Sequence, residues 1–345
     1  MTAGRSLTLL APALFGPLPG LGEDQTAALA DHLPELRALR TLAARGRRRP
    51  GVELEAALLN AFGHPADSGI APLTRLADQG EPPAGYCLRA DPVHLLAGQH
   101  NLVMAGAGEA LGLEPDEAAA CITTLNDLYA ERGWWFEAPL QGRWYLHLPQ
   151  TPGLTTTPLA AVMGRPVDEH LPTGAAARDW NGVLAEIQMA LHAHPVNAER
   201  AVRGLPAVNS VWFWGGGGVP PRSPASGPSP QLWSDEPLAL GLAHLHGVER
   251  HDRVDHATAW LAASAAGDHI VPLPGGRYSA RESPGAWLDH LERLEQDWLG
   301  PLLAELRQRR LTRLTLLGSA AGIEVTPARL YRFWRRPQPL HRLLT

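Results

Sequence analysis

The chain has 345 residues, enough for one large hydrophobic core or two smaller ones, and we expect two domains. All of its 30 basic residues are arginine, and 35 acidic residues bring the net charge to −5, which argues against bulk attraction to nucleic acid or to an anionic membrane. No apolar run is long enough to cross a bilayer. Two cysteines far apart in the chain, Cys87 and Cys121, predict free buried thiols and a cytoplasmic location.

The first predicted elements lie in the N-terminal part of the chain. Residues 6–11 have the apolar content of a first strand, and Pro12 and Pro17 interrupt the run that would otherwise resemble a secretion signal. Residues 37–51 contain six arginines and no acid. This pattern is typical of a basic helix end that passes into a solvated loop, with nucleic-acid binding as the alternative.

A polar triplet follows in the sequence RADPVH. Arg89, Asp91 and His94 are candidate pocket residues. The alternative is an Arg–Asp pair that fixes a turn before Pro92.

A helix is predicted from Asp179, because apolar residues then recur at helical spacing. Pro195 ends it, since a residue before proline avoids helical geometry. His194 and Asn197 therefore lie at the helix end, followed by Arg200. One turn could direct all three side chains at a single anion. Alternatively, Asn197 and His194 only cap the preceding helix and brace a domain hinge.

Residues 208–214 have the β-branched and aromatic content of a buried strand that runs into four glycines. In open α/β sheets ligands bind at the carboxyl edge of the strands, where glycines let backbone amides approach an anion. Gly215, Gly216 and Gly217 are therefore candidate ligand residues, flanked by Trp212 and Trp214. A plain flexible loop is the alternative for the glycines.

The C-terminal part supplies the clearest helix, residues 283–310, followed directly by the strand-like residues 311–318. Pro301 is expected to kink this helix. Short strands alternating with longer helices predict an α/β fold with a mostly parallel sheet flanked by helices. The passage of residues 244–256, before this helix, invites a metal interpretation through four histidines together with Asp252 and Asp255, but a helix C-terminus also favours cationic histidine. The histidines are His244, His246, His251 and His256.

One long motif carries a family resemblance. The sequence EIQMALHAHPVNAERAVRGLPAVNSVWFWGGG, residues 186–217, resembles the archaeal-type, cofactor-independent phosphoglycerate mutases. It is more similar still to the bacterial RpfE-type regulatory proteins, which are offshoots of that family. The shorter sequences LRADPVHL, residues 88–95, and RFWRRPQPL, residues 332–340, also resemble the bacterial group.

The resemblance implies an alkaline-phosphatase-like core made of residues 1–75 and 205–345, with a smaller cap domain inserted at residues 76–204. Active members hold two metal ions with Asp and His side chains, and a serine hydroxyl carries the phosphoryl group. The metals neutralise phosphate charge and activate the serine, while cationic side chains hold the acidic substrate.

The sequence departs from this pattern at three places that the metal site needs. The first strand has no acid before Glu23, the late strand ends in Gly318, Ser319 and Ala320, and residues 276–287 replace an acid- and histidine-bearing segment. No serine matches the nucleophile, and the chain has no lysine for the phosphoserine. Without these clusters a catalytic metal pair cannot be held.

We therefore expect a pseudoenzyme, with no catalytic residue, metal or cofactor. Its expected role is regulatory, through a small acidic or phosphorylated metabolite or a protein partner, with no nucleic acid or membrane partner. One alternative is an active phosphoglycerate mutase or phosphatase. Another is a scaffold without a small ligand that uses the arginine-rich tail from Arg329.

Overall fold

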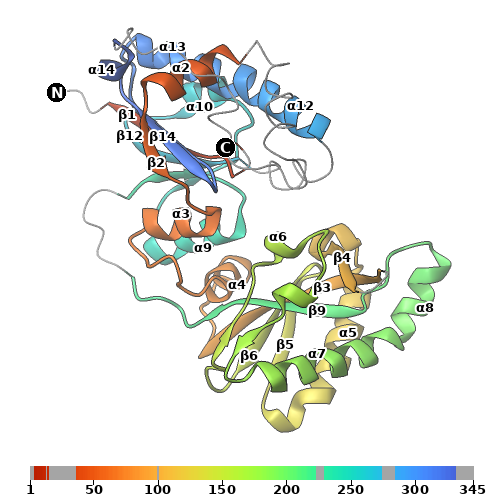
Figure 1. Cartoon of the computed structure of the whole chain (residues 1–345). Helices are drawn as coiled ribbons and strands as arrows, with labels where there is room; N and C mark the ends of the chain where they lie inside the picture. Colours follow the sequence, from red (N-terminus) through yellow and green to blue (C-terminus); the bar gives the residue numbers. More distant parts are fainter. Residues whose placement is uncertain are drawn as a thin grey trace. The chain divides into compact units, whose positions relative to one another are not determined.

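The structure is a computed structural model that describes residues 4–12, 14, 36–98, 101–222, 229–273 and 284–331. The chain divides into two compact units, each with its own sheet (Figure 1). Unit 1 consists of Met1–Asp67 and Arg222–Thr345, and unit 2 of Ser68–Pro221. The inserted unit is therefore somewhat longer than the predicted cap, residues 76–204, and it includes the strand expected at residues 208–214.

Within the described residues, the sheet of unit 1 has seven strands and is parallel at its centre. Strand β1 lies between β12 and β13 and pairs in parallel with both, so that Leu7 is opposite His269 on one side and Leu314 on the other. Strands β14 and β2 extend the sheet in antiparallel fashion. In spatial order the strands are β11 (Arg250–His251), β10 (Gln231–Trp233), β12 (Gly267–Pro272), β1 (Arg5–Leu10), β13 (Leu311–Leu317), β14 (Ala321–Val325) and β2 (Arg47–Pro50).

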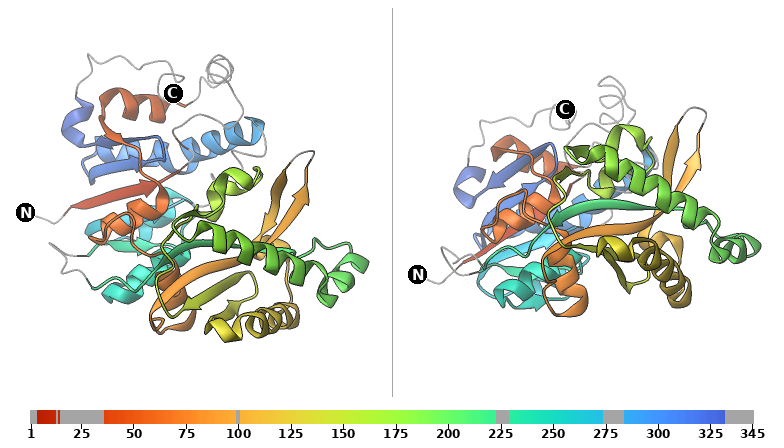
Figure 2. Two further views of the ribbon diagram at one scale, coloured as in Figure 1. Left: turned by 60° about the horizontal axis from the view of Figure 1, so that its bottom comes forward. Right: turned by 90° about the horizontal axis from the view of Figure 1, so that it is seen from below.

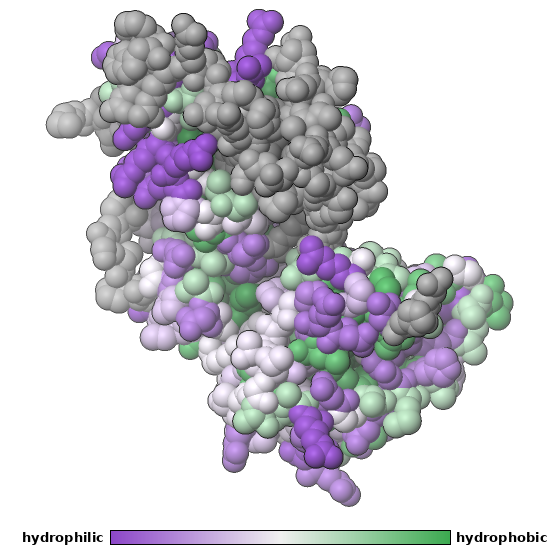
Figure 3. All heavy atoms as spheres, viewed as in Figure 1, coloured by the Kyte–Doolittle hydropathy of each residue, from purple (hydrophilic) through white to green (hydrophobic). Residues whose placement is uncertain are grey.

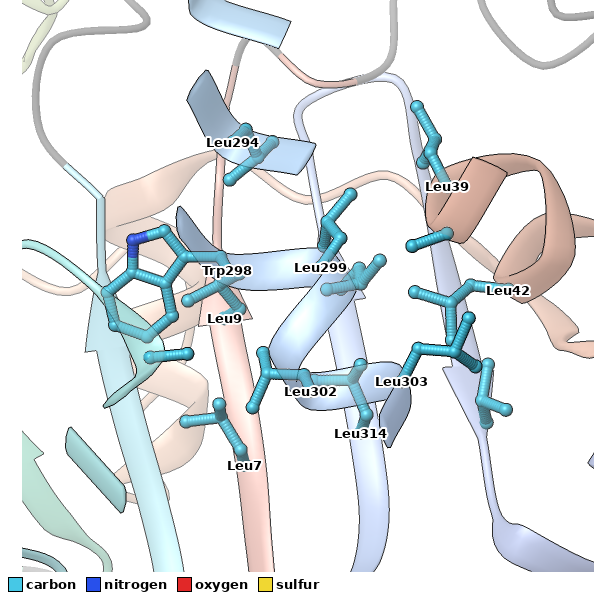
Figure 4. Close-up of a cluster of buried hydrophobic side chains, with 14 of the residues drawn as sticks. Leu7, Leu9, Leu39, Leu42, Leu294, Trp298, Leu299, Leu302, Leu303 and Leu314 are labelled. Atoms are coloured by element: carbon cyan, nitrogen blue, oxygen red, sulfur yellow. The ribbon is translucent and has the colours of Figure 1, made fainter. Parts of the chain in front are cut away.

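Helices pack against this sheet and bury its apolar residues. The predicted long helix is interrupted by a π-helical turn just before Pro301, whose ring nitrogen has no N–H for the regular ladder. Trp298 and Leu302 then pack in one core with Leu7 and other leucines of β1 and β13 (Figure 4). The helices of unit 1 are α2 (Arg37–Arg45), α3 (Leu54–Ala61), α9 (Pro237–His246), α10 (Ala257–Ala263), α12 (Pro284–Leu294), the turn η4 (Glu295–Leu299), α13 (Gly300–Arg307) and α14 (Pro327–Leu330).

The sheet of unit 2 is antiparallel, and the long strand β3 is its centre. One side of β3 pairs with β9, and the other side pairs with β6 and then with β4. The strands are β3 (Tyr86–Ala97), β4 (Leu102–Ala107), β5 (Trp135–Leu140), β6 (Arg143–Leu148) and β9 (Ser210–Gly217), with a separate ladder of β7 (Leu154–Thr155) and β8 (Thr173–Gly174).

Helices cover both faces of this second sheet. Leu88 and Ala90 of β3 face the core under α5 and α7, whereas Cys87 packs with Ala71 of α4. Figure 2 shows α7 running along β9. The helical elements of unit 2 are α4 (Ala71–Gln79), η1 (Gly108–Leu111), α5 (Pro115–Tyr129), η2 (Ala130–Arg132), α6 (Leu159–Val162), η3 (Asp168–His170), α7 (Ala177–His192) and α8 (Pro195–Val202).

Most of the predicted elements are confirmed, and two need correction. The mainly parallel α/β sheet, the first strand and the helix end at Pro195 agree with the structure. However, β9 is antiparallel to β3 in unit 2, because helices on both faces of an antiparallel sheet produce the same unbroken apolar run as a parallel sheet. In addition, Arg47–Pro50 is a strand instead of a solvated loop.

Both cysteines are free and buried as predicted, and burial raises the pKa of the Cys87 thiol to about 12 and that of Cys121 to about 11. Within the described residues, no helix is long and apolar enough to cross a membrane. Residues 276–283 and 332–340, which belong to segments discussed above, lie outside the described part.

Candidate functional site

The carboxyl edge of the parallel strands in unit 1 is the first candidate site, because open α/β sheets bind ligands there. The two central strands β1 and β13 end beside each other, and the Ser319 amide donates to the Pro12 carbonyl at 3.2 Å. The Ser319 hydroxyl donates to Oε2 of Glu53 at 2.9 Å. Ala11 and Gly318 complete the ends of these strands. This part of the edge therefore offers backbone groups, one hydroxyl and one carboxylate.

The neighbouring strands β10 and β11 add an exposed charge cluster to the same edge. Arg253 contacts Asp255 at 2.9 Å and Asp235 at 3.5 Å, and all three residues are exposed. Exposed pairs of this kind contribute little to stability because water and salt screen them. The two carboxylates share one arginine, so the three side chains together carry a net negative charge.

The mutase resemblance implies a pair of metal ions at this edge, and the donor set can be tested for it. Among residues 4–12, 14, 36–98, 101–222, 229–273 and 284–331, no group of three or more His, Cys, Asp or Glu side chains is placed to hold a metal ion. The nearby carboxylates face other partners: Glu53 accepts from Ser319, and Asp235 and Asp255 face Arg253. The described residues therefore do not fit a two-metal centre.

The four histidines considered for a metal do not form one group in the structure. His244 is exposed on α9, and His256 caps α10 by accepting from the Ala259 amide at 3.1 Å. His251 stacks on Trp233, with ring centroids 4.1 Å apart. The helix interpretation of this passage is confirmed, because α9 ends at His246 with a left-handed glycine after it.

His246 instead forms a buried pair that the sequence did not indicate. Its Nε2 lies 2.8 Å from Nε2 of His64, and the two residues are 5% and 4% exposed. Burial lowers the pKa of both imidazoles, and for His246 the nearby His64 and Arg222 lower it further. Arg222 also donates to the His246 carbonyl at 2.6 Å. His246 therefore holds the two segments, near residues 64 and 222, at which the chain leaves and re-enters unit 1.

A polar cavity of about 560 Å³ adjoins this pair within unit 1. Its wall includes Arg222, Gln231, His246 and His251. Within the described part of the chain, Nε2 of His251 is buried without a hydrogen-bond partner. The cavity is small-molecule sized, but it lies away from the carboxyl ends of β1 and β13.

The predicted anion-binding residues of the long motif are in unit 2, and their side chains are occupied by the protein itself. Arg200 is fully buried and pairs with Glu117 at 2.6 Å. It also donates to the Pro206 carbonyl at 2.9 Å and to the Leu111 carbonyl. Burial raises the pKa of Glu117, but the Glu114 amide and the Arg200 guanidinium together bring it below its usual value. The Arg200–Glu117 ion pair therefore forms entirely within unit 2.

The side chains of Asn197 and His194 likewise make hydrogen bonds with neighbouring groups of unit 2. The Asn197 amide group donates to the carbonyls of Leu191 and Val208 at 2.7 and 2.8 Å and accepts from the Val208 amide at 2.8 Å. His194 caps α8 by accepting from the Val196 amide, and its Nε2 lies 3.0 Å from the Thr124 hydroxyl. These contacts favour the alternative in which the motif braces α7, α8 and the start of β9. Ligand binding by these residues stays a prediction.

The candidate glycines are the last three residues of β9, and the segment before α4 packs against them. A Cβ atom on Gly217 would lie 2.6 Å from Cα of Gly69, and one on Gly216 would lie 2.4 Å from the Tyr86 hydroxyl. The Gly215 carbonyl accepts from the Ile70 amide at 2.9 Å. The absence of side chains at these positions therefore lets the segment before α4 approach β9 closely, which corrects the expected position at the carboxyl edge of a parallel sheet.

Arg89 and Asp91 form a buried network instead of a turn, because both lie within β3. Nη2 of Arg89 is 2.6 Å from Oδ1 of Asp91, and the Trp214 indole donates to Oδ2 at 2.7 Å. The Arg89 guanidinium lies over the rings of Trp214 and Tyr145, 5.1 and 5.5 Å from their centroids. Burial alone would lower the pKa of Arg89, but the Asp91 carboxylate outweighs it and raises it. His94 is separate and contacts the Ala207 carbonyl at 2.8 Å.

The predicted site residues do not converge on one point. Asn197 contacts Val208, just before β9, whereas the glycines are at the far end of the strand. From Ser210 to Gly216 a strand spans about 20 Å at 3.3 Å per residue. Sequence analysis did not identify the partners Glu117 and His64. Glu117 belongs to the capping box at the start of α5, but that pattern does not indicate its pairing with Arg200.

Comparison with known proteins gives partial matches. No family model matches the chain. A 2,3-bisphosphoglycerate-independent phosphoglycerate mutase from Methanothrix thermoacetophila is 38% identical over 64 residues, 19% of this chain and 16% of that protein. The enzyme of the same name from Methanosarcina mazei is 28% identical over 160 residues, 44% of this chain and 38% of that protein. The chain thus matches well under two thirds of either relative's length.

A solved structure shows the same fold over nearly the whole chain. The PH0037 protein from Pyrococcus horikoshii superposes with a TM-score of 0.55 and 14% identity, covering 94% of this chain and 88% of that one. The chain is therefore related in sequence to phosphoglycerate mutases, and its α/β fold with a mainly parallel sheet flanked by helices is confirmed.

Proposed function

We propose that the chain is a degenerate relative of the cofactor-independent phosphoglycerate mutases, of the bacterial RpfE type, with a regulatory role in place of catalysis. Its expected partners are a small acidic or phosphorylated metabolite or another protein. The sequence relatives place it beside the mutases, and the long motif of residues 186–217 supplies the resemblance to the regulatory group.

One observation carries the proposal. The central strands β1 and β13 end in Ala11, Pro12, Gly318 and Ser319, where phosphotransfer would need carboxylate and imidazole ligands. The Glu53 carboxylate accepts the hydrogen bond that the Ser319 hydroxyl donates. Asp235 and Asp255 at this edge face Arg253, so these groups do not assemble a metal-activated nucleophile.

The test is a metal analysis of the purified full chain together with a mutase assay. The assay follows interconversion of 3-phosphoglycerate and 2-phosphoglycerate with and without added manganese, and the Methanosarcina mazei enzyme is the positive control. We expect substoichiometric metal and no manganese-dependent turnover. Two equivalents of tightly bound metal with isomerase activity would overturn the proposal in favour of an active mutase.

The binding part of the proposal is tested by calorimetry with the same phosphoglycerates. Weak binding without turnover supports a metabolite-sensing role. A second candidate, a scaffold without a small ligand, is favoured by the complete burial of Arg200 among protein partners. Absence of binding to any such anion would make the scaffold the leading function.

A further inference from the structure

The strand β2 is an exposed edge with an unusual charge. It is the last strand of the unit 1 sheet and pairs with β14, and within the described residues no strand lies on its other side. All four of its residues, Arg47–Pro50, are exposed. Figure 3, drawn in the view of Figure 1, shows hydrophilic surface over this strand.

Positive charge is concentrated around this edge although the chain as a whole is acidic. Residues 37–50 carry six arginines and no acid, in a protein whose net charge is −5. Successive strand residues point to opposite faces, so Arg47 and Arg49 lie on one face of the sheet and Arg48 on the other. Arg49 pairs with Glu324 of β14, and its side chain is still 42% exposed. The edge therefore presents the Arg47 side chain and the exposed part of Arg49, whereas Arg48 on the other face also has a partner within the protein.

An exposed strand edge offers backbone N–H and C=O groups to an added strand. Arginine forks bind carboxylates through paired, charge-assisted hydrogen bonds. Together these two features match an extended peptide with acidic side chains. Residues 37–51 contain no aromatic residue on which nucleic-acid bases could stack, which disfavours single-stranded nucleic acid.

We propose that β2 is a docking site for an acidic, extended peptide segment of a partner protein, which adds to the sheet as a strand beside β2. The opposing explanation is that the arginines only protect the edge from association with other sheets. The two explanations differ in a measurable way, because only docking predicts saturable binding of an acidic strand.

The experiment uses the full chain and a fluorescein-labelled peptide of four Glu-Val repeats, with binding measured by fluorescence anisotropy at two salt concentrations. The double variant Arg47→Gln/Arg48→Gln removes two charges at the edge. The matched control, Arg250→Gln/Arg313→Gln, removes two exposed arginines elsewhere on the same sheet, one of them on the opposite edge strand β11. Circular dichroism and melting temperature verify that both variants fold.

We expect saturable binding to the wild type, at least tenfold weaker binding to the edge variant, and less than a twofold change in the control. A peptide with the same charges but N-methyl groups on alternate backbone nitrogens is expected to lose binding. Equal binding of that peptide, or equal weakening in both variants, would overturn strand addition.

Two further outcomes would also overturn the proposal. A single-stranded thymidine octamer that binds more tightly than the peptide, and only to the intact edge, would assign the surface to nucleic acid. No peptide binding together with self-association of the edge variant would assign the arginines to edge protection. Neither outcome alters the metal and turnover results, so this proposal and the proposed function fail separately.

Discussion

The charged candidate residues of unit 2 and the charged residues at the carboxyl edge of the unit 1 sheet are held in different ways. In unit 2, Arg200 and Asp91 are completely buried, and they form ion pairs with Glu117 and Arg89 respectively. In unit 1, Arg253 and Asp235 at the carboxyl edge of the sheet are exposed and only loosely paired. The residues that carry the family resemblance are thus the ones that hold unit 2 together. Resemblance to an enzyme family can therefore mark residues needed for folding as well as those needed for chemistry.

Removal of the Arg200 guanidinium is the strongest test of whether the buried residues of the motif stabilise unit 2. In Arg200→Met, the carbonyls of Leu111 and Pro206 lose their donor and Glu117 loses its buried partner. Removing one partner of a buried ion pair costs about 3–5 kcal/mol in the free energy of unfolding. Urea unfolding followed by tryptophan fluorescence measures the loss.

The control is Arg203→Gln, which removes the second arginine on the same carboxylate, Glu117. The Arg203 side chain is 44% exposed, so its pair is screened by water. Its removal is expected to cost less than about 1 kcal/mol. Equal costs for the two variants, or wild-type stability in Arg200→Met, would contradict a bracing role for Arg200 and return it to the anion-binding hypothesis.

A second test concerns the glycines of β9. A methyl group added in Gly217→Ala would meet the backbone of Gly69 at 2.6 Å, so one segment must shift. Overpacking of this kind costs about 1–3 kcal/mol in the free energy of unfolding. In the control Gly218→Ala the nearest atom is 4.0 Å away, and no loss is expected. A tolerated Gly217→Ala would show that this part of β9 is loosely packed, as the loop alternative requires.

The sequence predicted the fold better than the site, and β9 shows why. Hydrophobic periodicity and proline positions depend on neighbours in the chain, so the helix end at Pro195 and the parallel sheet of unit 1 could be predicted. The partner strand of β9 could not be predicted, because an apolar run buried on both faces has the same pattern in a parallel and in an antiparallel sheet. Its glycines were consequently assigned to the wrong edge.

The site residues depended on contacts that no local pattern encodes. Arg200 and Glu117 are 83 positions apart, and His64 and His246 are 182 apart. The composition of a motif shows that a side chain can bind an anion, but not whether the anion is a ligand or the protein's own carboxylate. Only the fold distinguishes the two.

A third test uses pH on the buried histidine pair of unit 1. Because the pKa values of His64 and His246 are lowered in the folded protein, the unfolded state takes up protons first as pH falls. The stability contributed by the neutral pair is therefore complete above about pH 6.5 and decreases as pH falls below that value. Melting temperatures between pH 8 and pH 5 should show this decrease.

The variant His64→Gln/His246→Gln should have a smaller drop in melting temperature over the same pH range than the wild type. His244→Gln is the matched control, because His244 lies on the same helix α9 but is exposed. It should keep the wild-type pH profile. An unchanged profile in the double variant would show that other groups cause the acid sensitivity.

The smallest effect is expected at the exposed edge of unit 1, in Ser319→Ala. The Ser319 hydroxyl donates to Glu53, an exposed residue that water can solvate once the bond is lost, so the cost should be about 0.5 kcal/mol or less. Ser234→Ala near the same edge is the comparison variant. Ser234 is buried and accepts from the Glu236 amide at 2.9 Å, so the loss of this hydrogen bond should cost about 1 kcal/mol. Unfolding measurements on both variants, with calorimetry of phosphoglycerate, decide whether this ranking holds. If Ser319→Ala instead abolishes anion binding or turnover while stability is unchanged, the hydroxyl contacts the ligand itself, and the loosely held edge of unit 1 is a working site.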